Sequence, residues 1–345
     1  MSSINSSLSH PTRAASIAKY QSSVKRKSIW QLCNSFLPFF ASWYLMYLSL
    51  GVSYWLTLLL ALPTAGFFVR MFIIQHDCGH GSFFNSRKAN DLWGMISSVF
   101  TLTPYHYWRK SHAIHHANAG KLENRGIGDI YTMTVDEYLQ KSSWGKFKYR
   151  LYRNPFILFI LFPPVLFTIV YRFPLSKANP LKQIRRSVYL TDLAIALVSG
   201  GMIWLVGLKA FLLVQVPITL ISSSTGAWLF YVQHQFEDTY WSGKPDWDVT
   251  KAALQGSSYY ELPKVLQWFT GNIGFHHVHH LNPRIPNYSL EKCHEENPMF
   301  QKTVVLTLRS SLQSLPLRLW DKGQHKLISF SVLRRRQQEG LAGLA

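Results

Sequence analysis

Charge is scarce in this sequence and avoids its long apolar segments. Only 15% of the 345 residues are Asp, Glu, Lys or Arg, compared with roughly 25% in an average soluble domain. The apolar segments contain almost none of these side chains, which is the distribution expected of a chain that crosses a lipid bilayer. This scarcity argues against an ordinary soluble globular protein.

Acidic residues are the scarcer of the two charged classes. The chain has 17 Asp and Glu against 36 Lys and Arg, a formal net charge of +19. No nucleic-acid-binding motif accompanies this excess, so we expect no nucleic-acid partner. We attribute the positive charge first to cytoplasmic loops that meet anionic lipid. A face that docks an acidic protein is the second explanation.

Cysteine is also rare, with Cys33, Cys78 and Cys293 the only examples. Three cysteines cannot all pair, and their spacing does not match a zinc site, so we expect reduced thiols. The N-terminus has neither the apolar core nor the cleavage site of a signal peptide. We therefore expect residues 1–27 to form a disordered cytoplasmic tail, and residues 323–345 to form a basic C-terminal tail.

Sequence motifs for redox cofactors are missing. The chain contains no G-x-G-x-x-G fingerprint of dinucleotide binding and no His-Pro-Gly-Gly of a fused cytochrome b5 domain. Any electrons that its chemistry requires must therefore come from a separate protein.

Four long apolar segments are present, and each has about twenty residues, enough to cross a ~30 Å hydrocarbon core as a helix. Short breaks divide them into two predicted helical hairpins. The expected spans are residues 31–50, 53–75, 188–206 and 210–232.

Two further apolar stretches should not form complete spans, on physical grounds. Residues 91–104 are too short, and residues 155–171 are broken by Pro163 and Pro164, which remove two backbone donors. Crossing at the second stretch would also export the basic loop 172–187, against the positive-inside rule. We predict an all-α integral membrane protein over residues 28–322. It has four transmembrane helices in two hairpins, interfacial or re-entrant helices and a cytoplasmic helical cap, with both termini in the cytoplasm.

Histidine is the residue type with the clearest pattern. Ten of the 14 histidines fall in four places. Positions i, i+3 and i+4 share one face of a helix, so each cluster can direct several imidazoles to one point. The clusters are His76 and His80; His112, His115 and His116; His276, His277, His279 and His280; and the single His234.

A metal centre is the physical explanation for so many convergent imidazoles. Buried without metal, they would repel one another when protonated and need many hydrogen-bond partners when neutral. Eight or nine nitrogen ligands exceed the capacity of one metal ion, so two ions are implied. Imidazole suits iron, and a redox-active pair of irons beside a bilayer indicates O₂ chemistry on an alkyl chain.

The three histidine boxes and their order resemble the membrane-bound fatty-acid desaturase family. The resemblance extends over roughly residues 28–322 and is closest to the acyl-lipid delta-5 desaturases of Gram-positive bacteria, with delta-12 desaturases as a sister branch. The motifs that carry it are Tyr152-Arg153-Asn154-Pro155-Phe156, Val232-Gln233-His234-Gln235-Phe236-Glu237-Asp238, and Thr270-Gly271-Asn272-Ile273-Gly274-Phe275 through Pro286-Asn287-Tyr288.

This resemblance implies a set of iron ligands. Eight come from the boxes, and His234 matches an additional family ligand between the second and third boxes. Phe230 stands where part of the family has an Asn that holds a metal-bound water, so that feature is not expected. The implied ligands of the two Fe ions are His76, His80, His112, His115, His116, His234, His276, His279 and His280.

The resemblance also implies an activity and partners. We expect a cis double bond to be introduced at delta-5 into acyl chains of membrane phospholipids, with O₂ as oxidant and ferredoxin or flavodoxin as electron donor. The open alternatives are a delta-12 desaturase, a related di-iron hydroxylase or ketolase, and, in another class, a non-catalytic membrane sensor of metal or lipid.

Several neighbours of the boxes have expected supporting roles. Asp77, Asp129 and Glu237 are candidates to orient imidazole N–H groups, because ligating histidines usually donate to a carboxylate or carbonyl. The equal alternative is that they are ordinary solvated acids. We expect His277 to lie beside the metal centre without binding it, and Cys78 to be a bystander. Structural or exposed positions are expected for His10, His106, His294 and His325.

Overall fold

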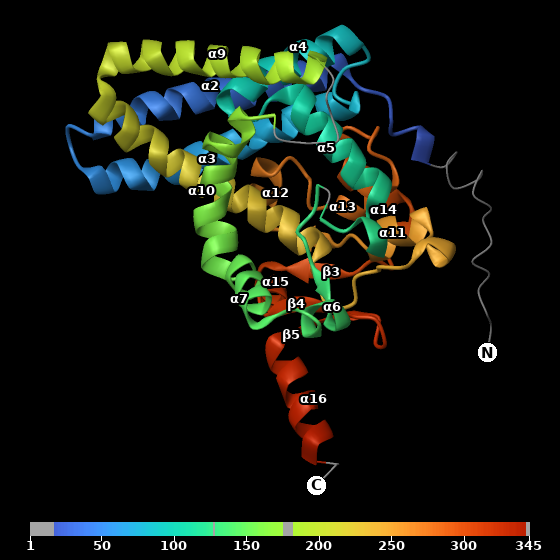
Figure 1. Cartoon of the computed structure of the whole chain (residues 1–345). Coiled ribbons are helices and arrows are strands. Elements are labelled where there is room, and N and C mark those ends of the chain that lie inside the picture. The colour runs from blue at the N-terminus through green and yellow to red at the C-terminus, as the bar shows by residue number, and fades with distance from the viewer. Residues whose placement is uncertain (1–16, 127, 175–181, 343–345) are drawn as a thin grey trace.

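Two long helical hairpins form the apolar part of the structure (Figure 1). The first joins α2 (Lys25–Ser49) to α3 (Tyr54–His80), and the second joins α9 (Lys182–Val206) to α10 (Leu208–His234). The turns of both hairpins lie at the same end of the bundle, on the left in Figure 1. The computed structural model describes residues 17–126, 128–174 and 182–342.

The helices differ in how apolar they are. By length and composition α3, α9 and α10 could each cross a membrane. Helix α2 is similarly long but is not apolar enough to meet the same criterion, because its sequence includes several polar residues. Four of the polar side chains of α2, including Gln31 and Ser49, are buried: Gln31 donates to Asn287 Oδ1 (3.0 Å), and Ser49 hydrogen-bonds with Thr57 (2.7 Å).

The bundle ends that carry histidine lie opposite the hairpin turns. Helix α3 ends directly after His80, because Gly81 adopts a φ of 71°, a left-handed conformation that closes helices. Helix α10 ends at His234. Two of the long apolar helices therefore each deliver histidine side chains at their last residues.

Two shorter helices follow α3 and fold back against it. They are α4 (Arg87–Phe100) and α5 (Tyr105–Asn118). The Tyr105 hydroxyl donates to the Cys78 carbonyl oxygen (2.8 Å) and so ties the start of α5 to α3. Gly94 leaves room for this tyrosine, since a Cβ there would lie 2.3 Å from its ring. At 14 residues, α4 is too short to span a bilayer.

The stretch with the two prolines is a bent helical segment. Helix α7 (Ser143–Tyr152) is followed by a π-helical turn, η2 (Ile157–Leu161), by α8 (Phe162–Thr168) and by a 3₁₀ turn, η3 (Val170–Arg172). The chain bends by 54° between α7 and the helical run that follows it. Pro163 and Pro164 lie in the first turn of α8, where a missing N–H is tolerated.

The remaining elements form a cap to the right of and below the bundle in Figure 1. Its helices are α6 (Val135–Leu139), α11 (Val249–Gln255), α12 (Lys264–Phe269), α13 (His276–Leu281), α14 (Asn287–Glu296), α15 (Leu308–Ser311) and α16 (Phe330–Ala342), with 3₁₀ turns at Leu122–Asn124, Lys244–Asp246, Pro298–Phe300 and Leu312–Ser314.

Two small sheets, which the sequence did not predict, brace this cap. In the first, β4 (Leu317–Asp321) lies between β1 (Met133–Thr134), which is parallel to it, and β5 (Lys326–Ser329), which is antiparallel. In the second, β2 (Tyr259–Glu261) and β3 (Val305–Thr307) pair in parallel. The fold is otherwise helical, as predicted.

The expected boundaries of the folded region need correction at both ends. Ile17 and Tyr20 are buried against α13 and α14, so residues 17–27 are folded rather than a disordered tail, while residues 1–16 lie outside the described residues. At the other end, a boundary at residue 322 would divide the β4–β5 hairpin. These segments are too short and too polar to carry a clear periodic signal.

Candidate metal centre

All nine predicted ligand histidines come together at the histidine-bearing end of the bundle, in two groups. Within each group, one nitrogen from every ring lies within 4.8 Å of the others. The five-histidine group contains His76, His80, His112, His116 and His279, and the four-histidine group contains His115, His234, His276 and His280.

Each H-x-x-H-H box contributes to both groups. On α5, the i, i+4 pair His112 and His116 points into the five-histidine group, whereas His115 points into the four-histidine group. On α13 the arrangement is reversed, with His276 and His280 in the four-histidine group and His279 in the other. Adjacent residues on a helix are about 100° apart, so one box can serve two centres.

The spacing of the ring nitrogens fits bound metal ions. Nitrogens about 2.0–2.1 Å from one metal, at angles of 90–110°, lie roughly 2.9–3.4 Å apart. The Nε2 atoms of His276 and His234 are 2.9 Å apart, those of His279 and His116 are 3.0 Å apart, and those of His115 and His280 are 3.3 Å apart. The donor set and its spacing therefore suit a metal ion in each group.

Two ligand rings are oriented by groups that can only accept hydrogen bonds. His76 Nδ1 lies 3.1 Å from Asp77 Oδ1, and His234 Nδ1 lies 3.1 Å from the Gly256 carbonyl oxygen. Because a carboxylate and a carbonyl only accept, each Nδ1 carries the proton, and the lone pair of each Nε2 faces its group. The Nε2 of His80 is buried and has no hydrogen-bond partner among the described residues.

Burial keeps the ligand histidines outside the long helices neutral. Desolvation, reinforced by the neighbouring imidazoles, lowers their pKa values well below 6.5. Neutral imidazole is the form that binds a metal. The residues concerned are His112, His115, His116, His276, His279 and His280.

The three candidate orienting carboxylates differ in position. Asp77 is in place beside His76. Asp129 is partly buried in the cavity lining, desolvation raises its pKa, and its carboxylate accepts from the Ile130 N–H (2.7 Å). Glu237 follows the alternative expectation of an ordinary solvated acid: its exposed side chain pairs with Lys326 (3.0 Å).

The other nearby histidines form a separate pair. His277 is fully buried, and its Nε2 lies 2.9 Å from His294 Nδ1. Burial and the neighbouring His294 lower the pKa of His277 to about 3. Neither residue belongs to a metal-binding group among the described residues.

Phe230 packs between the groups and the cavity described below, with its ring centroid 5.1 Å from that of His115.

The two groups differ in exposure. All four members of the four-histidine group are buried, whereas His80, His112 and His116 of the five-histidine group are only partly buried. The five-histidine group is therefore the one closer to the protein surface.

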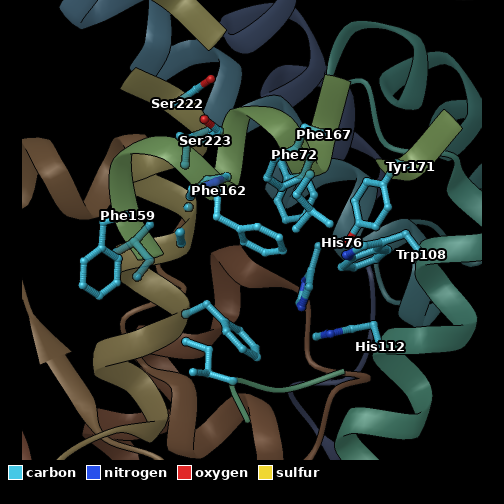
Figure 2. A pocket seen from close by; sticks show the side chains of 18 of the residues that line it. Phe72, His76, Trp108, His112, Phe159, Phe162, Phe167, Tyr171, Ser222 and Ser223 are labelled. Atoms are coloured by element: carbon cyan, nitrogen blue, oxygen red, sulfur yellow. The ribbon is translucent and has the colours of Figure 1, made fainter. Parts of the chain in front are cut away.

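A largely apolar, partly open cavity of about 370 Å³ adjoins the five-histidine group (Figure 2). His76 and His112 contribute to its lining, and Trp108 stacks on His112 with a centroid distance of 4.6 Å. Most of the remaining wall comes from α3, the bent α7–η3 segment and α10, and the rest from α5 and connecting loops. Most of these residues could not be recognised from the sequence because they are ordinary apolar side chains. The aromatic side chains of the cavity that Figure 2 labels are Phe72, Trp108, Phe159, Phe162, Phe167 and Tyr171.

Comparison with known proteins provides an independent line of evidence. The family model described as fatty acid desaturase matches residues 53–310. A fatty acid desaturase of Bacillus subtilis is 49% identical over 318 residues, which cover 92% of this chain and 90% of the relative. The sn-1 oleoyl-lipid 12-desaturase of Synechocystis is 26% identical over 65% of this chain and 63% of its own. The sn-1 acyl-lipid omega-3 desaturase (ferredoxin) of a Nostoc species is 28% identical over 66% and 63%, respectively.

Proposed function

This chain belongs to the fatty acid desaturase family, and we propose that it introduces a cis double bond at delta-5 into the acyl chains of membrane phospholipids. It is an oxidoreductase by that membership. The observation that carries the proposal is the convergence of nine histidines in two groups beside an apolar cavity.

We infer that the two groups hold two iron ions, one in each. The nitrogen spacing and the orientation of His76 and His234 by acceptor groups support this assignment. Together with O₂, bound iron would supply the oxidising power needed to remove hydrogen from an unactivated alkyl segment.

The chain's own residues would position the substrate and exclude water. The aromatic wall and α10 line the cavity with mostly apolar side chains, so an acyl chain in it would lie against His76 and His112 and displace water. The balanced reaction joins one O₂, two protons and two donor electrons with the two hydrogens of a –CH₂–CH₂– segment. Its products are one alkene and two water molecules.

The position of the double bond rests on the motif resemblance, and delta-12 is the second candidate. The relative named as a 12-desaturase supports it, although at 26% identity. The acyl-lipid substrate is supported by the same kind of evidence, since the names of the Synechocystis and Nostoc relatives refer to lipid-linked chains.

We further propose that ferredoxin or flavodoxin delivers the electrons. These donors are acidic, which suits a chain with a net charge of +19, and the Nostoc relative has ferredoxin in its name. The partial exposure of His80, His112 and His116 supports electron entry on the side of the five-histidine group.

The proposed topology has both hairpins crossing the membrane, with the termini and the metal centre in the cytoplasm. It is supported by the common position of the two hairpin turns, opposite the ends of α3 and α10 (Figure 1). The membrane domain would then comprise approximately residues 17–329.

The deciding experiment is lipid mass spectrometry of a host that lacks polyunsaturates and delta-5 alkenes. The host expresses either the intact chain or its His115→Ala variant, and derivatisation locates the double bonds. We expect a new delta-5 alkene only with the intact chain. A delta-12 alkene would favour the second candidate, and an alcohol or ketone would indicate the related hydroxylase or ketolase chemistry.

A further inference from the structure

The face that α10 turns toward the cavity consists mostly of small side chains. They recur at the i, i+3, i+4 and i+7 positions that share one side of a helix. The hydroxyls of Ser222 and Ser223 donate to carbonyl oxygens of their own helix, both at 3.3 Å, so they do not require a polar ligand. The small residues of this face are Thr219, Ser222, Ser223, Gly226 and Ala227.

Gly226 is the position on this face where an added side chain would enter empty space. A Cβ built on Gly226 would have no heavy atom within 4 Å. Gly66 and Gly94 contrast with it, because a Cβ there would lie 2.6 Å from Phe269 and 2.3 Å from Tyr105, respectively. Close packing against neighbouring side chains therefore explains Gly66 and Gly94 but not Gly226. Glycine inside a helix costs about 0.5–1 kcal/mol relative to alanine, so Gly226 requires another explanation.

Along α10, Gly226 lies between two parts of the cavity. It lies four residues, or about 6 Å, before Phe230, whose ring contacts those of His115 and His234. Another turn farther from the histidines are Ser222 and Ser223, which Figure 2 shows on the far side of Phe162 from His112. A larger side chain at Gly226 would therefore stand between the metal-side part of the cavity and the part lined by these serines.

We propose that Gly226 determines the length of acyl chain that the enzyme accepts, because its missing side chain admits the substrate to the serine-lined part of the cavity. This inference rests on the proposed function and extends it to substrate selection. Bulk at this position should discriminate against long chains, while shorter chains that do not reach past it should still be oxidised.

The test uses the full-length, iron-loaded protein in vesicles of phosphatidylglycerol with tetradecanoyl, hexadecanoyl or octadecanoyl chains. Wild type, Gly226→Ala and Gly226→Leu are supplied with O₂ and a reduced donor, and the alkene formed from each chain is measured. A mismatch of one or more methylenes in an apolar pocket changes selectivity by on the order of tenfold or more. We therefore expect Gly226→Leu to lower the octadecanoyl-to-tetradecanoyl product ratio by at least about tenfold, and Gly226→Ala to lower it less.

Gly201→Leu is the matched control. Gly201 lies on α9, is exposed on the outside of the bundle, and likewise has no heavy atom within 4 Å of an added Cβ. This variant adds the same side chain to an apolar helix away from the cavity, so its product ratio should equal that of the wild type.

A binding readout makes the inference independent of turnover. Native mass spectrometry measures how much octadecanoyl and tetradecanoyl phosphatidylglycerol each variant retains when both are offered equally. An unchanged retention ratio in Gly226→Leu would overturn the inference, as would loss of all activity in Gly226→Leu with an unshifted ratio in Gly226→Ala. A wild type that binds long chains selectively but makes no alkene would refute the proposed function alone.

Discussion

Asp77 accepts two hydrogen bonds from Asn287, one from its backbone N–H (2.7 Å) and one from its side-chain amide (2.8 Å). The other carboxylate oxygen of Asp77 lies 3.1 Å from His76 Nδ1. One side chain thus connects a histidine of the first box with the start of α14, just beyond the third box. The position of His76 therefore depends on contacts 210 residues away in the sequence.

Replacing Asp77 by Asn should weaken iron binding without removing a ligand. An Asn side chain has one acceptor oxygen instead of two. It cannot accept a hydrogen bond from His76 Nδ1 as well as both bonds from Asn287, so the imidazole loses its fixed orientation. Substitution of such outer partners typically reduces metal affinity or activity about 10–100-fold. Iron titration followed by plasma mass spectrometry measures the change. Glu237→Gln, at an exposed carboxylate paired only with Lys326, should behave like the wild type.

Removing one histidine from either group should abolish desaturation and lower the iron content. His80→Ala tests the five-histidine group, and His280→Ala tests the four-histidine group. His277→Asn is the contrasting variant, because His277 is paired with His294 and lies outside both groups. Full iron content in either alanine variant, or loss of iron in His277→Asn while the protein remains folded, would contradict the assignment.

Arg153 should be important for stability rather than for chemistry. It is fully buried, and its guanidinium donates to Thr132 Oγ1 (2.9 Å), Gln235 Oε1 (3.0 Å) and the Leu317 carbonyl oxygen (3.1 Å). Arg153→Met would remove these buried, charge-assisted hydrogen bonds together, at a cost of about 3 kcal/mol. A thermal unfolding midpoint in detergent should fall clearly. Arg335→Met, at an exposed position, is the control and should leave the unfolding midpoint unchanged. A lower midpoint in this variant would show that any loss of positive charge destabilises the chain.

The outer face of α7 should contact lipid. Trp144, Phe147 and Leu151 share that face and are 63%, 53% and 47% exposed, and the helix contains Lys146, Lys148 and Arg150 but no acidic residue. This pattern is typical of a helix lying in the headgroup region. A nitroxide at Phe147→Cys, in a Cys33→Ser background, should be more accessible to O₂ than to a water-soluble nickel complex. The same label at the exposed Lys302 should show the opposite preference.

An acidic electron donor should dock on the outer face of α5. Ala113 and Ala117 are exposed there, next to the partly buried ligands His112 and His116, and their small side chains permit close approach. Ala113→Glu with Ala117→Glu should raise the KM for reduced ferredoxin or flavodoxin. Turnover with a small chemical reductant should not change. If Arg334→Glu with Arg335→Glu raises the KM instead, the donor binds near α16.

The features that the sequence predicted well are those with a strong local signal. Helical hairpins follow from long apolar runs, and the convergence of histidines follows from their i, i+3 and i+4 spacing. The division of each H-x-x-H-H box between two groups could not be predicted, because it depends on the rotation of α5 and α13 against each other. The cavity wall and the Asp77–Asn287 connection arise from segments far apart in the chain, and the short strands of the cap have no periodicity to detect. For Glu237, nearness in sequence left two alternatives open, and the turn after His234 leaves it a solvated acid.

The division of each box also has a thermodynamic consequence. Helices α5 and α13 both donate to both groups, so ordering these helices around one ion prepares ligands for the other. Most of the conformational entropy of α5 and α13 would then be lost when the first ion binds. The second ion should bind more tightly because less entropy remains to be lost, which is positive cooperativity without direct contact between the sites. Cells short of iron would accordingly hold a mixture of empty and fully loaded molecules rather than a population with one ion each.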